Sequence, residues 1–296
     1  MNSGDRIVLG LGALMVLCRL FIPEWSEWIA LALMICAGIP HGAFDLRVAE
    51  LRWSSKRVSR GIIVSVYLAC VVTMGALCVF MPLWGLLVFL TISAAHFSEG
   101  EATTSSWVGR YQGWLYGIGA ILLPIGFHID QAGDYLAYFI STADFSMISL
   151  YVRWLAAVVG FLITAQLLRA TIVHRSWNRS DTLQRGVCLG CWLMLPPLAG
   201  FAVWFVGRHS RLHLETCAAR LSDSSRRLPL DFIAISVLAI LGLAPFSFMF
   251  DFSDIGQLFA AALCLIAGLT LPHMIVTYGM REHVARRSGG PEGLSE

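Results

Sequence analysis

The chain has 296 residues, of which 57% are hydrophobic and only 14% are charged, and its formal net charge at pH 7 is +2. Soluble domains carry about 25% charged residues, so this composition excludes an ordinary soluble protein. The net charge is small and no basic stripe is interleaved with aromatic residues, which gives no indication of a nucleic-acid partner. The expected surroundings of most of the chain are therefore the lipid bilayer.

Apolar stretches of about 20 residues, the length that crosses a bilayer as a helix, recur along the whole chain. They predict spans near 6–22, 27–46, 60–80, 83–101, 108–128, 150–172, 230–250 and 255–279. The region 184–222 is interpreted as two further spans, because Pro196-Pro197 ends one helix and starts another. A re-entrant hairpin over 184–200 is the alternative. We expect an all-α polytopic transmembrane helix bundle of about 8–10 spans, and we favour ten.

The loops between these stretches differ in charge, which predicts their orientation. Segments 46–60 and 169–185 are basic, and the second ends at Arg185. The acidic loops, which contain no lysine or arginine, are 23–27, 129–149 and 251–254. The positive-inside rule places the basic loops, and with ten spans both termini, in the cytoplasm. We expect one integral-membrane domain over 1–296 in the plasma membrane, with a short polar cytoplasmic tail at 281–296.

Five of the eight histidines lie inside the apolar stretches, and all five are on spans that would run from outside to inside. They are His41, His96, His209, His213 and His273. At 1.5 Å per residue their depths allow one common layer in the cytoplasmic half of the bilayer. Four helices that bring imidazoles to one layer are what a metal centre in a helix bundle needs. We expect His128, at an outer span end, to be structural or solvated.

The second helix of the region 184–222 contains several more polar residues. They are Arg208, His209, Arg211, His213 and Glu215. Such residues near mid-membrane are costly, so they are expected to face the bundle interior and to have partners. His209 and His213 are four residues apart, share a helix face and could bind one ion together.

Three carboxylates lie near the histidines in the sequence. They are predicted to form hydrogen bonds to the histidines without binding the metal themselves. Asp45 follows His41 by four residues and Glu99 follows His96 by three, so each pair shares a helix face, and Glu215 lies near His213. Such carboxylates could accept the outer N–H of a ligand histidine. The count fits one metal with three or four histidine ligands and open positions, which implies activation of O₂ or water. A site reached from lipid implies an apolar substrate.

The residues alone leave other interpretations open. A single histidine in a membrane helix is usually a hydrogen-bonding core residue. A b-type haem protein would use paired histidines on two facing helices, and a proton-coupled transporter would use histidine and glutamate as a relay without metal. A di-iron desaturase needs more histidine boxes than this sequence contains.

Four motifs resemble the Brp/Blh family of integral-membrane carotenoid 15,15′-dioxygenases. They are the Pro-His-Gly-Ala-x-Asp box at 40–45, the Ala-His-Phe box at 95–97, the pair His209 and His213, and the Pro-His-Met box at 272–274. They occur in family order over most of the chain. The Ser-Glu-Gly-Glu run after His96 and the Arg-Leu order inside the histidine pair depart from the pattern, which bears on substrate choice more than on chemistry.

The resemblance implies a membrane-bound iron oxygenase that cleaves the central 15,15′ double bond of β-carotene or a related carotenoid with O₂, giving two molecules of retinal. It implies that four histidines hold a non-haem ferrous ion, Fe²⁺, and by motif these are His41, His96, His209 and His213. His273 matches a further family histidine, a possible fifth ligand or auxiliary residue. The product retinal would pass to a microbial rhodopsin.

Overall fold

The computed structural model describes residues 1–53, 58–102, 106–174, 179–221 and 228–277. Within these ranges the ordered elements are all helices and no strand occurs. The predicted all-α class is therefore confirmed. The predicted tail at 281–296 lies outside the described residues.

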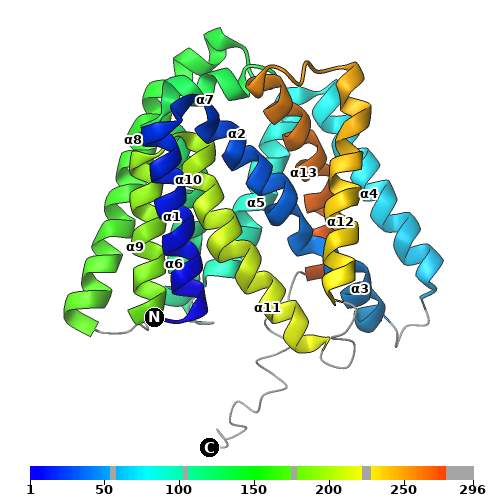
Figure 1. The fold of residues 1–296 in the computed structure, drawn as a ribbon, viewed down its shortest axis with the longest axis horizontal. Helices are drawn as coiled ribbons and strands as arrows, with labels where there is room; N and C mark the ends of the chain where they lie inside the picture. Colours follow the sequence, from blue (N-terminus) through cyan, green and yellow to red (C-terminus); the bar gives the residue numbers. More distant parts are fainter. Residues whose placement is uncertain (54–57, 103–105, 175–178, 222–227, 278–296) are drawn as a thin grey trace, which may run out of the picture.

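Long helices stand side by side and form the body of the molecule (Figure 1). The regular ones are α1 Ser3–Phe21, α4 Arg60–Phe80, α5 Pro82–Glu101, α6 Trp107–Phe127, α8 Thr142–Arg169, α9 Arg179–Met194, α12 Leu228–Leu243 and α13 Ile255–Thr277. Short helical segments adjoin them: α7 Ile129–Leu136, η4 Ala170–His174 and η7 Ala244–Phe248. Two further helical runs change geometry along their length and are described below.

Helix ends coincide with local sequence signals. Proline occupies the first turn of α2, α5 and α10, where its missing N–H has no helical partner to lose. The side chains of Ser59, Ser106 and Ser141 accept backbone N–H groups at the starts of α4, α6 and α8. The predicted break within 184–222 is confirmed, since α9 ends at Met194 and α10 begins at Pro197.

Several helices have the length and composition of membrane spans. Among the described residues five helical runs meet that test, or six if the bent pair α6 and α7 is counted as one. The outward face of α8 exposes large apolar side chains, including Tyr151, Trp154 and Phe161. An apolar surface of this kind is suited to contact with lipid. The chain is thus a helical protein with several membrane-capable helices.

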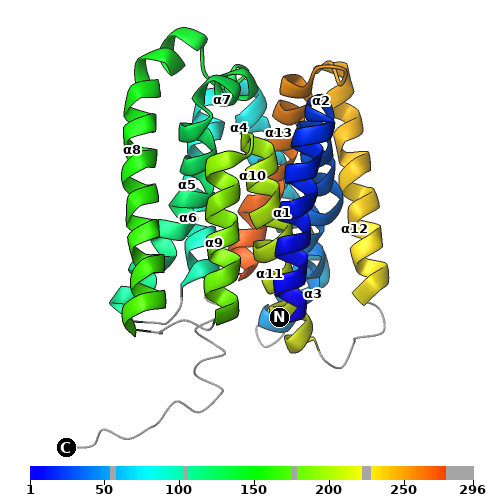
Figure 2. The ribbon, with the colours of Figure 1, turned by 60° about the vertical axis from the view of Figure 1, so that its left-hand side comes forward.

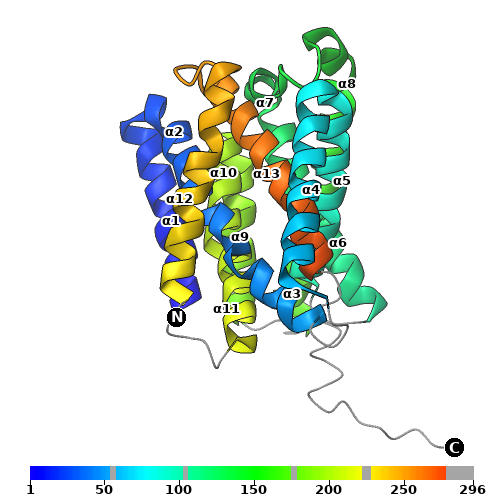
Figure 3. The same cartoon turned by 90° about the vertical axis from the view of Figure 1, so that its right-hand side faces the viewer.

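The two ends of the bundle differ in charge. α7 and the connection from α12 to α13 lie at one end, whereas α3 and the N-terminus lie at the opposite end (Figure 1, Figure 3). α7 carries Asp130 and Asp134, and α3 carries Arg47 and Arg52. One assignment is wrong: Arg185, predicted in a basic loop, lies buried within α9.

Two helical runs leave regular α geometry where they contain a histidine of the predicted site. The first consists of α2 Pro23–Leu33, the π-helical turn η1 Met34–Gly38, the 3₁₀ segment η2 Ile39–Phe44 and α3 Asp45–Trp53. The second consists of α10 Pro197–Trp204, the π-helical turn η5 Phe205–Ser210 and α11 Arg211–Arg220. His41 lies in the 3₁₀ segment and His209 in the second π turn. Such irregular turns redirect side chains and are frequent at functional sites.

Glycines allow α6 to approach α5, the helix that carries His96; the two lie side by side (Figure 2). A Cβ atom added at Gly117 would lie 2.6 Å from the backbone nitrogen of Ser98 and 2.9 Å from the carbonyl oxygen of Ala94. These contacts are closer than side-chain carbon can tolerate, so the interface requires a residue without a side chain. Small residues serve this purpose widely in membrane helix pairs.

We predict that Gly117→Ala lowers stability by about 1–3 kcal/mol, because the added methyl group overpacks the α5–α6 interface. Gly186 is the matched control: it lies exposed on α9, and a Cβ there meets nothing within 4 Å. Gly186→Ala should be neutral or stabilise by up to about 1 kcal/mol, since alanine favours helix. Thermal unfolding of both variants in one detergent is the measurement. An equal response at the two positions would contradict the close packing.

Candidate metal centre

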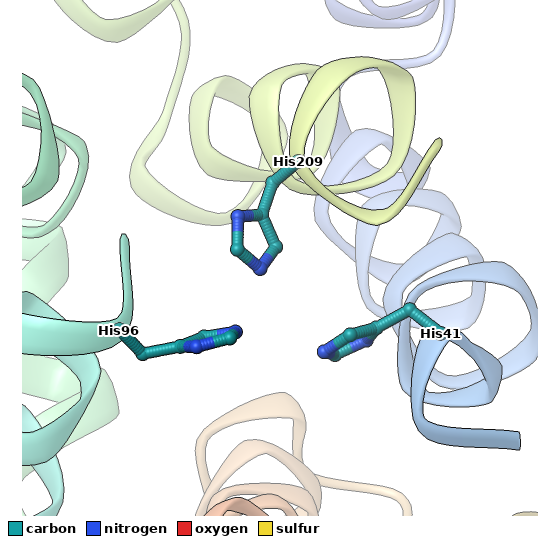
Figure 4. Close-up of side chains that lie close together, drawn as sticks. All are labelled: His41, His96 and His209. Atoms are coloured by element: carbon teal, nitrogen blue, oxygen red, sulfur yellow. The ribbon is translucent and has the colours of Figure 1, made fainter. Parts of the chain in front are cut away.

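The five histidines predicted from the sequence lie together in the bundle. The ring centroid of His41 is 6.3 Å from that of His96, 5.5 Å from those of His209 and His213, and 4.8 Å from that of His273. Figure 4 shows the rings of His41, His96 and His209 pointing toward a common centre. One donor nitrogen from each of these three lies within 4.8 Å of the others. The predicted convergence of imidazoles from separate helices is confirmed.

Hydrogen bonds to acceptors fix the proton position on two of the rings. Nδ1 of His41 lies 2.6 Å from the carbonyl oxygen of Gly38, and Nδ1 of His273 lies 2.8 Å from Oδ1 of Asp45. A carbonyl and an ionised carboxylate only accept hydrogen bonds, so Nδ1 donates in both rings. In a neutral imidazole Nε2 then has a free lone pair. Both rings are therefore in the tautomer that binds metal through Nε2.

The Nε2 atoms of His96 and His209 also lie inside the cluster. Nε2 of His96 lies 3.3 Å from Nε2 of His273. Nε2 of His209 is one of the few buried side-chain nitrogen and oxygen atoms in the described part of the chain that have no hydrogen-bond partner. A buried polar atom without a partner needs a physical explanation, such as an ion. A cation among these rings would bind the Nε2 lone pairs of His41 and His273 and would give Nε2 of His209 a partner, so the donor set fits a metal that prefers imidazole, such as iron, copper or zinc.

His213 lies at the edge of the cluster and is only partly buried. Its Nε2 is 3.3 Å from the sulfur of Cys217, one turn further along α11. A donor nitrogen of His213 also lies within 4.8 Å of donor atoms of Asp45 and His273. His209 and His213 thus both reach the cluster, as their spacing predicted.

Asp45 is buried and supports a histidine, although a different one from its neighbour in sequence. Both of its carboxylate oxygens lie within hydrogen-bond distance of Nδ1 of His273, and the hydroxyl of Tyr67 donates to Oδ2 at 3.0 Å. The predicted pairing with His41 is replaced by Gly38, whose carbonyl accepts from that ring. The reason is the 3₁₀ segment: at three residues per turn, positions four apart no longer share a face.

The other two carboxylates have different surroundings. Glu99 lines a small cavity of about 50 Å³ beside His96, His209 and His213. Glu215 is not brought to the histidines, because its side chain is 56% exposed and forms an ion pair with Arg211 at 2.8 Å. Residues 209 and 213 face the cluster, and 215 falls on another side of α11.

A buried ionic network next to the histidines was not predicted. The carboxylate of Glu101, only 1% exposed, forms ion pairs with Arg185 at 2.8 Å and with Arg208 at 2.9 Å. The indole N–H of Trp204 donates to the same carboxylate at 3.1 Å. Asp181 pairs with both arginines. The network therefore joins α5, α9 and the π turn that contains His209.

One signal in the sequence could have revealed this network. Arg208 stands inside an apolar helix, and an arginine in that position requires an acidic partner from another helix. The expectation of such a partner is confirmed. Glu101 ends an apolar stretch that also contains His96, so its position is suitable for such a partner, but the choice between Glu99 and Glu101 depends on the rotation of α5.

A large apolar cavity of about 480 Å³ adjoins the histidines. Its polar lining residues are few: His41, Asp45, Tyr67, Ser93, His96, Tyr135, Thr270 and His273. Four of these eight belong to the histidine cluster or to Asp45, so the chemistry of the cavity is concentrated where the imidazoles lie. The remainder of the wall suits a long apolar ligand.

We predict that Glu101→Gln destabilises the protein by about 3–5 kcal/mol, because two buried guanidinium groups lose a shared counter-charge. Glu215→Gln is the matched control, since an exposed pair contributes only about 0.2–1 kcal/mol. Thermal unfolding in detergent compares the two variants. Similar small effects at both positions would show that the network around Glu101 does not hold the helices together.

Comparison with known proteins agrees with the motifs. A family model described as Beta-carotene 15,15'-dioxygenase matches residues 32–281. The chain is also 27% identical, over 274 residues, to a protein named Beta-carotene 15,15'-dioxygenase from Uncultured marine bacterium 66A03, with 88% of this chain and 96% of that protein covered. No solved structure matches the chain. Because the family model spans most of the sequence and all five clustered histidines, the chain belongs to the beta-carotene 15,15'-dioxygenase family.

Proposed function

We propose that this protein is a membrane-embedded non-haem iron oxygenase that cleaves the central 15,15′ double bond of β-carotene with O₂ to give two molecules of retinal. The observation that supports this most directly is the position of the histidines. Five imidazoles from four helical runs lie together, and three of them, those of His41, His96 and His273, line an apolar cavity of about 480 Å³. Family membership agrees with the same activity.

Fe²⁺ is the proposed metal, and His41, His96, His209 and His213 are the proposed ligands. His273 is a fifth candidate, because its Nε2 lies 3.3 Å from Nε2 of His96 and its Nδ1 is held by Asp45. When bound, ferrous iron would supply the activation of O₂ that a closed-shell alkene does not achieve unaided. A set of neutral imidazoles suits a ferrous ion in a dry site.

The protein itself would position the double bond of the substrate, exclude water, and hold the imidazole rings in fixed positions relative to one another. The overall change adds the two atoms of O₂ across one C=C bond and yields two C=O groups, so no proton is gained or lost. The apolar lining of the cavity agrees with a reaction that needs no general acid beside the substrate. Phe97 and Phe205 border His209, with ring centroids 4.9 and 5.8 Å away, and fix its orientation by packing.

The arrangement of the rings argues against a b-type haem. His41 and His96 are nearly parallel at 6.3 Å, as a facing pair would be. The rings of His209 and His273, however, lie 4.8–5.5 Å from both of them, in the plane that the macrocycle would have to occupy. A proton-coupled transporter is less favoured because the cavity beside the histidines is apolar.

We also infer that the chain crosses the plasma membrane ten times, with both termini in the cytoplasm. The charges support this, since the basic helix α3 and the N-terminus lie at the end of the bundle opposite to the acidic α7 (Figure 3). Retinal released into the bilayer would be available to a microbial rhodopsin.

Expression in cells that accumulate β-carotene is the test of the activity. We expect the cells to lose their yellow colour and to form retinal, identified by chromatography against a standard. Cells with the empty vector should keep their carotene. Bleaching without retinal would contradict cleavage of the central bond.

We predict that single replacement of His41, His96, His209 or His213 by alanine removes both bound iron and retinal formation. The purified wild-type protein should contain about one iron atom per chain and no haem absorption. His128→Ala, outside the cluster, should keep both properties. Metal analysis and activity are measured on the same preparation, and any variant that retains full iron and activity removes that histidine from the ligand set.

We predict that Asp45→Asn weakens iron binding by about 10–100-fold, because His273 loses the acceptor that fixes its tautomer. Tyr67→Phe removes only one hydrogen bond to the same carboxylate and should have a smaller effect in the same direction. Titration of the metal-free variants with Fe²⁺ measures both affinities. If the affinity of Asp45→Asn for Fe²⁺ is unchanged, the contact between Asp45 and His273 serves the fold and not metal binding.

A further inference from the structure

The apolar cavity extends from the histidines toward one end of the bundle only. Along α5 its lining residues run from His96 back to Leu86, and along α13 from His273 back to Phe259. At 1.5 Å per residue these stretches span about 15 and 21 Å. On their other side the histidines border the cavity of about 50 Å³ that contains Glu99. A ring-bearing apolar chain can therefore extend from the histidines into the large cavity but not into the small one.

The far end of the large cavity is closed by α7. This helix is bent by 102° from α6, and its residues Ala132, Tyr135 and Leu136 are buried and line the cavity. The hydroxyl of Tyr135 donates to Glu27 at 2.9 Å, and that carboxylate also accepts the N–H groups of Leu198 and Ala199 at the start of α10. The closing helix is thus tied to two neighbouring helical runs.

The side of the cavity is open to the apolar surface of the molecule. Leu68 on α4 and Leu238 on α12 both line the cavity, yet they are 57% and 62% exposed. A lipid-soluble chain can reach the cavity between these helices without crossing a polar layer. The cavity therefore has one open side, one closed end, and the histidines near its other end.

We propose that the α7-capped end is a stop that receives one end of the substrate and thereby determines which double bond lies beside the histidines. The inference rests on the proposed function. The stretches of about 15 Å on α5 and about 21 Å on α13 are long enough to hold half of a C40 polyene, from its middle to the far side of a terminal ring. With one ring against the stop, the central bond lies at the imidazoles, and the other half extends toward the open side.

Two substitutions at the closed end change the position of the stop. Ala262 is buried and lines the cavity eleven residues before His273 on α13, so Ala262→Phe makes the cavity shorter. Phe259 packs on Tyr135 with ring centroids 5.6 Å apart, so Phe259→Ala makes the cavity deeper. Ala157 on α8 is exposed, and Ala157→Phe adds the same volume away from the cavity.

The variants are tested with β-carotene, and the carbonyl products are separated and identified by mass. Each cleavage adds O₂ across one double bond, so a shift along the chain gives one carbonyl product longer than retinal and one shorter, the shorter one being a ketone where the cleaved carbon carries a methyl group. We expect unequal carbonyl products as the main products of Ala262→Phe and Phe259→Ala, whereas the wild type and Ala157→Phe give retinal alone. If folded cavity variants that retain iron cleave only the central bond, or cleave nothing, the stop is overturned. Failure of the wild type to form retinal would instead overturn the proposed function.

Discussion

The ion pairs of Glu101 with Arg185 and Arg208 are the interaction on which the site depends. Two arginines inside a bundle of apolar helices are tolerable only with a counter-charge, and Glu101 supplies it from α5. Arg208 is adjacent to His209 in the π turn, and Glu101 follows His96 on the same helix. The pairing therefore fixes the relative height of α5 and the π turn, and with it the 5.0 Å separation of the His96 and His209 rings.

Contacts within the protein arrange the histidines for the proposed metal. Gly38 and Asp45 each hold the Nδ1 proton of a ring, which leaves Nε2 of His41 and His273 as lone-pair donors. His209 is oriented by aromatic packing and keeps an unpaired Nε2. Rings held in this way would lose little conformational entropy on binding the proposed cation, which would favour affinity at a site with neutral ligands.

The sequence predicts the helices from the length of its apolar stretches, and it predicts the convergence of the histidines from their positions within those stretches. Both quantities can be counted directly along the chain. It does not predict which carboxylate serves which ring. Asp45 supports His273 instead of His41 because a 3₁₀ segment changes the angle between them, and irregular turns have no strong local signal. Glu101 was missed and Arg185 placed in a loop for a related reason: pairing between distant helices depends on their rotation.

If the protein is embedded in the membrane as proposed, the opening between α4 and α12 makes the relevant substrate concentration a concentration in the bilayer. A carotenoid would reach Leu68 and Leu238 by lateral diffusion, never leaving lipid. Turnover at low substrate should therefore follow the mole fraction of carotenoid among the lipids and fall on dilution with inert lipid, even when the total amount is unchanged. The two retinal molecules would leave through the same opening by which the next carotenoid enters from the bilayer. Product exit and substrate entry would therefore compete.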